Sequence, residues 1–393
     1  MGATVQVDEE LFDVRPVFAW QRTIGLVPSA QERHTAQRAL NVALIGWLPL
    51  AVFAAATELI FRSGTAHSFL TDVAVHIRFL IALPLLILAE ADAIPRFGHV
   101  ASHFLSAGFI EEQDRERYAD AVKSTRQLLD SKVADVAAVL LTYIIVAGLI
   151  YNLRRFEVPA WYWTSPDRPL GLSPAAWWQA LVSLPLLLFL CMGWLWRVLL
   201  WWRFLAVMAR FDLRLVPAHP DRACGLHFVS SSLRGYRLLA FAVGAIVAGT
   251  ETNIALRIGQ QPFESKHAAI AVVAFVLLLA AGPLLVFIPK LRTTKTQGIF
   301  KYGPLGATVG KEFEQKWLDR SRTFDEPPLD SDDFSAMTDL YQVVGNVYEI
   351  KDLPFGWRDL YNLVIMALLP FIPLAMMAVP LTQIFQGLMK LLL

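Results

Sequence analysis

The sequence has few cysteines and few charged side chains for its length. Its 393 residues include two cysteines, Cys191 in an apolar run and Cys224 in a polar loop, which excludes a disulfide-stabilised scaffold. Charged residues make up 18% of the chain and hydrophobic residues 55%, which excludes an ordinary soluble globular protein. The first 39 residues mix acidic and basic side chains and lack the order of a cleaved signal peptide. We therefore expect a membrane protein whose N-terminal segment is retained.

Familiar catalytic motifs are also lacking. The sequence contains no His-Glu-x-x-His zinc helix, no phosphate-binding glycine loop and no Gly-x-Ser-x-Gly nucleophile turn. Asp330, Asp332 and Asp333 stand close together, but the glycine and final glutamate of a calcium loop are missing, so we interpret them as helix caps. The sequence predicts no enzymatic activity, no cofactor and no metal site, and we expect no nucleic-acid partner.

Seven long apolar segments dominate the rest of the chain. A helix needs about 20 apolar residues to cross a bilayer, and a polar backbone cannot cross lipid in an irregular form. The segments are 40–61, 73–89, 133–153, 180–200, 238–256, 268–288 and 360–379. The second is the least regular, because His76 and Arg78 interrupt it near one end. The sequence predicts an all-α polytopic transmembrane helix bundle over 40–393, after an N-terminal cytoplasmic segment at 1–39.

Basic residues are divided unevenly between the connections. Alternate connections hold 26 Lys and Arg residues on one side and 6 on the other. Because basic loops stay in the cytoplasm, the N-terminus is predicted to be cytoplasmic and the C-terminus to lie outside. The same rule makes the insertions at 93–132, 203–236 and 290–358 cytoplasmic, and they are long enough to hold helices.

Polar side chains occur at membrane depth near the outer ends of three segments. They are Glu58, His76, Arg78, Thr250, Glu251 and Asn253, with Thr252 beside them. With a rise of about 1.5 Å per residue, Arg78 and Glu251 lie at a similar depth and can meet. Intramembrane charges usually face a bundle interior or a water-filled cavity, which favours a substrate or ion pathway. Two structural alternatives stay open: Arg78 reaches the headgroups, or Arg78 and Glu251 form an ion pair that only holds helices together.

Proline lies inside five of the seven segments. The positions are Pro49, Pro84, Pro185, Pro283, Pro370 and Pro373. Each removes a backbone hydrogen bond, and broken helices often line transport sites, although proline is also frequent in transmembrane helices generally. The last segment, which holds two of them, is predicted to be bent.

The insertions predict helices of their own. Tyr118 and Leu129 lie on one apolar face of a helix that leads into the third segment, and Pro304 is a suitable first residue for another helix. A further apolar series, here called the seam, alternates steps of three and four: Phe334, Met337, Tyr341, Val344 and Tyr348. Two heptads are too few to establish a coiled coil, which favours packing of the seam on the protein's own helices over an intersubunit contact.

The insertion at 203–236 contains a compact polar motif, His219, Pro220, Asp221, Arg222, Ala223, Cys224, Gly225 and Leu226. A turn in which Pro220 fixes the backbone and Asp221 caps the next helix explains most of it. His219, Asp221, Cys224 and His227 also have the chemistry of zinc ligands, but not a recognised zinc spacing. Arg203, Arg210 and Arg214 are spaced to share one face of a helix that continues out of the fourth segment, where they can bind anionic phospholipid.

This motif, the order of the segments and the acidic stretch before Phe334 resemble a group of uncharacterised bacterial polytopic inner-membrane proteins whose loop reads His-Pro-Asp-Arg-x-Gly-Gly-Leu. The resemblance covers most of the chain and implies the bacterial cytoplasmic membrane, but no activity. Cys224 stands where that group has glycine, which argues against Cys224 as a shared ligand or nucleophile.

Two functions fit these features. The first is a transporter or channel for an ion or small solute, in which the polar cluster forms an outward-facing vestibule. The alternative is a membrane-anchored platform whose cytoplasmic helices bind a protein partner or a second copy of the chain. In both, the lipid bilayer surrounds the helices.

Overall fold

The computed structural model describes residues 33–61, 64–153, 158–164, 171–259, 265–318 and 332–378. These residues are helical apart from their connections and one isolated bridge between Trp163 and Leu172. Seven helical stretches within them are long and apolar enough to cross a membrane: Thr35–Phe61, Val73–Ser106, Glu112–Asn152, Pro174–Met208, Arg237–Arg257, Lys266–Trp317 and Trp357–Met377. The predicted all-α architecture with seven spans is confirmed, and helices of this kind contact the lipid bilayer.

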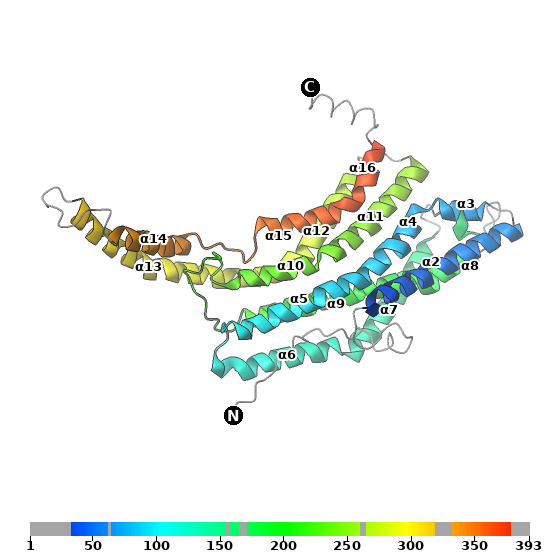
Figure 1. Cartoon of the computed structure of the whole chain (residues 1–393). Coiled ribbons are helices and arrows are strands. Elements are labelled where there is room, and N and C mark those ends of the chain that lie inside the picture. The colour runs from blue at the N-terminus through cyan, green and yellow to red at the C-terminus, as the bar shows by residue number, and fades with distance from the viewer. Residues whose placement is uncertain are drawn as a thin grey trace, which may run out of the picture.

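The two ends of the bundle differ in form (Figure 1). One end carries the short helices α3 (Thr65–Leu70) and α8 (Pro174–Trp178), and we call it the short-connection end. The other end carries α6 (Arg115–Leu129), α10 (Ser231–Gly235) and the long helix α13 (Ile288–Trp317), and we call it the long-helix end.

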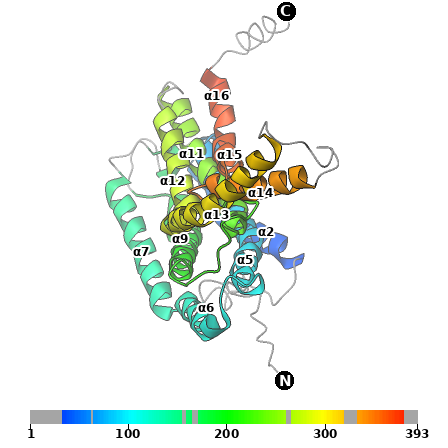
Figure 2. The same cartoon turned by 90° about the vertical axis from the view of Figure 1, so that its left-hand side faces the viewer.

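The first four spans pack against one another. Helix α2 (Arg33–Phe61) packs on α5 (Leu83–Ser106) and α8, and α9 (Leu184–Met208) packs on α5, α6 and α7 (Lys132–Asn152). Helix α7 stands at one edge of the bundle (Figure 2), and the apolar window of its span is 11% buried. Most of the α7 surface is therefore available to lipid.

Helix α11 (Arg237–Ile258) joins the two halves of the bundle. It packs on α4 (Val73–His76) and α5 on one side, and on α12 (Lys266–Ala281) and α15 (Trp357–Leu368) on the other. Its closest approach is at Gly244, where an added Cβ atom would lie 2.2 Å from the carbonyl oxygen of Ala367. Only a glycine allows the two backbones to meet at this crossing.

The helix geometry changes beside most of the prolines. The π-helical turns η1 (Ile77–Ala82) and η5 (Gln179–Ser183) come directly before Leu83–Pro84 and Leu184–Pro185. The 3-10 turn η8 (Gly282–Phe287) contains Pro283, and η10 (Leu369–Phe371) contains Pro370 and separates α15 from α16 (Ile372–Ala378). A proline has no N–H for the helical ladder and crowds the preceding turn, so the turns beside it adopt other hydrogen-bond spacings. The last span, which was predicted to be bent, thus changes its helical geometry at η10.

Two predicted helix boundaries are wrong. Helix α13 runs through Pro304 without a break, and it packs on α14 (Asp333–Tyr348) on both sides of this proline. Helix α9 ends at Met208, so Arg203, Arg210 and Arg214 do not share a helical face. Beyond α9 the chain alternates buried Phe211 and Leu213 with exposed neighbours, which is the pattern of an extended segment.

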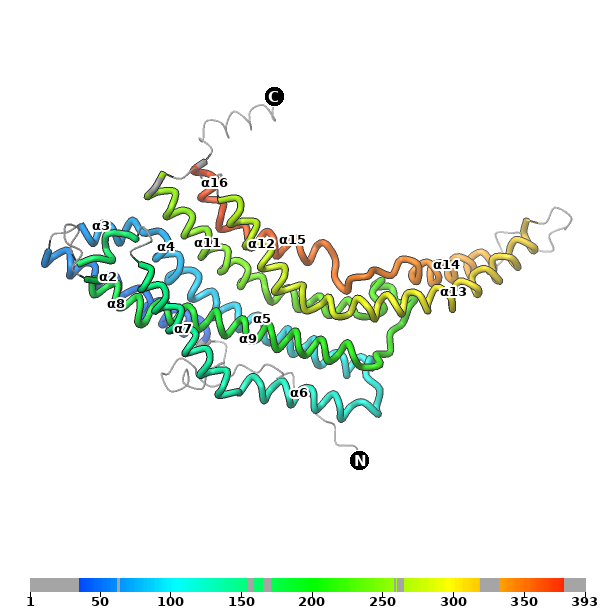
Figure 3. The backbone as a smooth tube through the Cα atoms, turned by 180° about the vertical axis from the view of Figure 1, so that it is seen from behind, coloured from blue at the N-terminus to red at the C-terminus, as the bar shows by residue number. Residues whose placement is uncertain are grey.

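Helices α13 and α14 form a hairpin that projects from the long-helix end (Figure 3). The segment 325–330, with its acidic residues and two prolines, and the tail from Leu381 lie outside the described residues. Helix α2 begins at Arg33, before the predicted boundary at residue 40.

Candidate functional site

The polar cluster predicted near the outer ends of the spans lies at the short-connection end. The Arg78 Nη2 atom donates a 2.9 Å hydrogen bond to Thr250 Oγ1, which joins η1 to α11. Thr250 in turn donates to the Ile246 carbonyl at 2.8 Å. Glu251 does not take part, because its Oε2 atom accepts from Ser265 Oγ at 2.7 Å. The expected pairing of Arg78 with Glu251 is replaced by a pairing of Arg78 with the preceding residue.

Two further members of the predicted cluster have local structural partners. Glu58 Oε2 accepts a 3.3 Å hydrogen bond from the Ala66 backbone N–H, at the start of α3. His76 Nδ1 accepts from Trp47 Nε1 at 2.9 Å, and its Nε2 lies 3.1 Å from the Leu70 carbonyl oxygen. These contacts favour a histidine with its proton on Nε2. Both side chains brace the connection between α2 and the second span.

Arg78 lines a cavity of about 290 Å³. Its other polar lining groups are Tyr162 and Gln179, and α7 supplies an apolar wall with Val146, Leu149 and Ile150. Among the described residues that line it there is no carboxylate. The side chain of Gln179 is 4% exposed, and its Oε1 atom accepts no hydrogen bond from the described residues. The cavity therefore combines one cation and one amide oxygen without a described hydrogen-bond donor with apolar walls.

Two of the polar residues that line the cavity, Arg78 and Gln179, belong to membrane spans, and both lie on π-helical turns. A π turn inserts an extra residue into the helical ladder and rotates the side chains around it, and such turns are frequent at functional sites. The signal in the sequence was a Leu-Pro pair shortly after each residue, at Leu83–Pro84 and Leu184–Pro185.

A buried network, which we did not predict, holds the connection over this cavity. Trp161 is fully buried, and its Nε1 atom donates to Asp72 Oδ2 at 2.9 Å. Ser173 Oγ donates to the Trp161 carbonyl at 2.7 Å. The same oxygen accepts from Ala176 N, so Ser173 caps the start of α8. This network positions the neighbouring Tyr162 at the cavity.

A second unpredicted feature is an ion pair inside the bundle. Arg197 on α9 donates to Glu90 on α5, and the two residues are 3% and 6% exposed. Each of the two charges would be costly alone inside the bundle, and the ion pair compensates both. A structural role in joining α5 to α9 therefore accounts for Glu90 and Arg197.

The polar motif at 219–227 is a tightly hydrogen-bonded loop. Asp221 accepts backbone N–H groups from Ala223, Gly225 and His227 at 2.9, 3.0 and 3.1 Å. Burial favours the neutral acid, but these three donors and His219 outweigh it and lower the pKa of Asp221. Asp221 is not the N-cap of the next helix, η6 (Leu226–Ser230), because Gly225 holds that position; its carboxylate instead closes the turn and reaches the His227 N–H in the first turn of η6.

Cys224 lies inside this loop. It is fully buried, and burial together with the nearby Asp221 charge raises the pKa of its thiol to about 12. Its φ of 56° is in the left-handed region that favours glycine, which is the residue expected there from the resemblance. Within the described part of the chain, no group of three or more His, Cys, Asp or Glu residues could hold a metal ion. The loop therefore acts as a structural element.

The same loop connects the elements of the long-helix end. The Arg222 carbonyl accepts from Lys351 N at 2.8 Å, and the Arg222 guanidinium lies 3.0 Å from Glu349 at the end of α14. Gly225 lies against the Phe109 ring, with a φ of 93° and room for no more than a hydrogen atom. Arg203 donates to Ser124 on α6 at 2.8 Å, and Arg214 pairs with Glu111 at 2.9 Å.

The seam residues pack on α13, as the favoured interpretation predicted. Phe334 contacts the Phe313 and Trp317 rings, each at a centroid distance of 5.0 Å. Along α13, Gly303, Gly306 and Gly310 make room for the other seam side chains, namely Tyr348, Val344, Tyr341 and Met337. The seam is thus used within one chain.

No protein-family model matches the sequence, and no curated protein or solved structure matches it either. The resemblance carried by the loop motif and the expected absence of enzymatic activity stay predictions.

Proposed function

We propose that this protein is a transport protein of the bacterial cytoplasmic membrane that takes up a small amphipathic anion at the Arg78 cavity. The excess of basic residues in the connections of the long-helix end supports an orientation in which the short-connection end, and with it the cavity, faces outward. The N-terminus is then cytoplasmic.

The observation that carries this proposal is the placement of Arg78 in a cavity whose described lining residues include no carboxylate. Arg78 is hydrogen-bonded to a neutral hydroxyl group, so its charge is left to attract an anion. The volume of about 290 Å³ is at the lower limit for a small-molecule site, and the apolar wall from α7 suits a short hydrocarbon or aromatic tail. Charged side chains at membrane depth usually mark such pathways.

Hexanesulfonate tests the proposal, because a sulfonate keeps its charge and does not cross lipid as a neutral acid. Purified protein should bind it in titration calorimetry, and proteoliposomes should take it up. Arg78→Gln should weaken binding by about 10-fold to 100-fold, the range expected for one hydrogen bond to a charged group. Arg78→Lys should retain part of both signals.

Arg115→Gln is the matched control, since Arg115 is exposed at the opposite end of the bundle and pairs with Glu112 at 3.0 Å. This variant should bind and transport like the wild type. Equal binding and uptake by the wild type and Arg78→Gln, with both folded, would remove Arg78 and this cavity from any transport pathway.

The platform function has narrower support. The seam packs on α13, so a partner would have to bind another face of the α13–α14 hairpin, where Phe300 and Leu305 are 77% and 50% exposed. Because the seam is already occupied, we place transport first. Capture of a partner by the wild type that is lost in Phe300→Ser would favour the platform function instead.

A further inference from the structure

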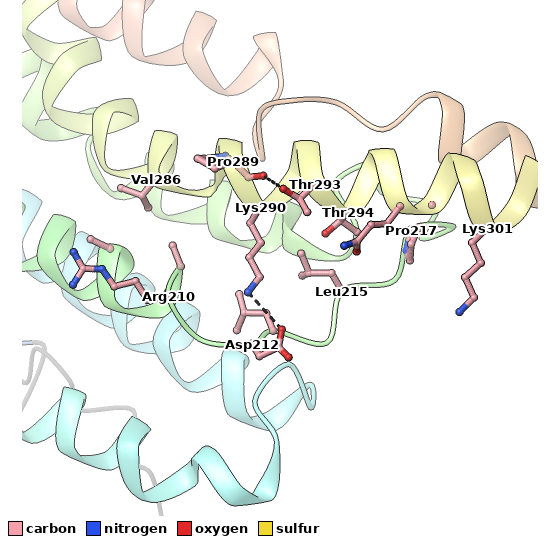
Figure 4. A pocket seen from close by; sticks show the side chains of 15 residues that line it. Arg210, Asp212, Leu215, Pro217, Val286, Pro289, Lys290, Thr293, Thr294 and Lys301 are labelled. Atoms are coloured by element: carbon pink, nitrogen blue, oxygen red, sulfur yellow. Dashed lines mark hydrogen bonds and ion pairs between the residues drawn. The ribbon is translucent and has the colours of Figure 1, made fainter.

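A second and larger cavity lies at the long-helix end. Its volume is about 820 Å³, and it opens between α13 and the extended segment that comes after α9 (Figure 4). It is separate from the Arg78 cavity, and its proposed ligand does not depend on the proposed transport.

The cavity has an excess of positive charge. Arg210, Lys290 and Lys301 line it, and Asp212 is the one carboxylate among its described lining residues. Lys290 donates to the Phe211 carbonyl and lies 3.8 Å from Asp212, whose side chain is 98% exposed and therefore offsets little charge. Neither Arg210 nor Lys301 forms an ion pair with a described residue.

One face of α13 supplies a row of hydrogen-bond donors to the cavity. Lys290, Thr294, Gln297 and Lys301 succeed one another at steps of four, three and four, so they lie on the same side of the helix. Lys290 and Lys301 point from α13 toward the same side in Figure 4. Lys290 and Lys301 are eleven positions apart, which corresponds to about 16 Å along the helix at 1.5 Å per residue. This distance leaves room for more than one phosphate.

The cavity lies where the apolar parts of two spans end. Ala206, Val286 and Pro289 form its wall toward the bundle, and they come from the last turn of α9 and from the junction of η8 with α13. Lipid-exposed Leu199, Trp202 and Leu285 precede these residues on the same two spans. Tryptophan is enriched at the height of lipid headgroups. A phospholipid can therefore place its headgroup in the cavity and its acyl chains on this apolar surface.

We infer that the cavity binds the phosphate-bearing headgroup of an acidic phospholipid from the adjoining leaflet. Basic pockets between membrane helices are suited to such headgroups, and the apolar surface beside the cavity favours a lipid over a free phosphate ion.

The test uses full-length protein that is purified, stripped of lipid with detergent and then titrated. The probes are phosphatidylglycerol, diphosphatidylglycerol, phosphatidylcholine and inorganic phosphate, and native mass spectrometry counts the bound molecules. The wild type should retain an acidic phospholipid and exchange phosphatidylcholine freely. Losing two charges in Arg210→Gln/Lys301→Gln should weaken acidic-lipid binding about 30-fold, or about 2 kcal/mol.

Arg115→Gln/Lys311→Gln is the matched control, because it removes the same two residue types from exposed positions that do not line the cavity. It should bind acidic lipid like the wild type. Arg210→Lys/Lys301→Arg keeps both charges and should retain most binding, which separates loss of charge from loss of folding. Unchanged binding in the Gln pair, or equal loss in both pairs, would overturn the inference. Inorganic phosphate that binds as tightly as lipid and displaces it would overturn the lipid assignment.

Discussion

The Asp221 carboxylate holds the loop between α9 and α10 by accepting three backbone N–H groups. In Asp221→Asn one acceptor oxygen is replaced by an NH2 group that faces a backbone donor, so at least one of these three hydrogen bonds is lost. The variant should be less stable by about 1–3 kcal/mol, seen as a lower Tm in detergent. Asp212→Asn, at a side chain that is 98% exposed, should leave the Tm close to that of the wild type.

The charge of Asp221 also predicts a pH dependence. Its pKa is lower in the folded chain than in the unfolded chain, so the carboxylate stabilises the fold above its unfolded pKa, about 4, and this contribution is lost as pH falls through the folded value. The Tm difference between the wild type and Asp221→Asn should be constant from pH 7 to about 5 and should shrink below about 4. A difference of the same size at pH 3 would show that charge is not the cause.

For single residues, the sequence predicted the depth in the membrane but not the side of the helix on which the side chain lies. The rise per residue placed Arg78 and the 250–253 cluster at one level, and they do lie together. Which of Thr250 and Glu251 faces Arg78 depends on the rotation of each helix, and the π turn at η1 changes that rotation locally. Glu90 was missed because the predicted second segment stopped one residue before it, and Arg197 has no nearby acid in sequence to reveal its partner.

At the scale of elements, the crossing of α11 and α15 depends on one glycine. Gly244→Ala would place a Cβ atom 2.2 Å from a backbone oxygen, so the two helices must separate. We expect a loss of about 1–3 kcal/mol, typical of overpacking, and a lower Tm in detergent. Gly148→Ala on α7 is the control, because nothing lies within 4 Å of its added Cβ atom. An equal effect of both substitutions would contradict the packing explanation.

The spans could be predicted well because a run of about 20 apolar residues usually forms a membrane-spanning helix. Helix boundaries outside the bilayer were harder, since tertiary packing decides them. Pro304 is a good helix start by itself, but three glycines on α13 let α14 pack closely and the helix continues through the proline. The end of α9 had a visible signal, the alternation from Phe211 to Arg214, which the spacing of three arginines concealed.

At the scale of the whole molecule, the orientation can be tested with thiol labelling. Cys224 is fully buried and Cys191 lies within the apolar helix α9, so an introduced exposed cysteine should give the main signal. In intact cells, an impermeant maleimide should label Thr71→Cys at the short-connection end, while Lys311→Cys on α13 should react only after lysis. Labelling of Lys311→Cys in intact cells would reverse the orientation and place the Arg78 cavity on the cytoplasmic side.

The continuity of the sixth span with α13 has a mechanical consequence. Helix α13 has 30 residues and is therefore about 45 Å long, and it joins α12 through the six residues of η8. A rod of this length works as a lever: a change of about 10° in the direction of the span at η8 would shift the far end of α13 by roughly 8 Å. A small change of direction at η8 would thus become a larger displacement at the tip of the projecting hairpin.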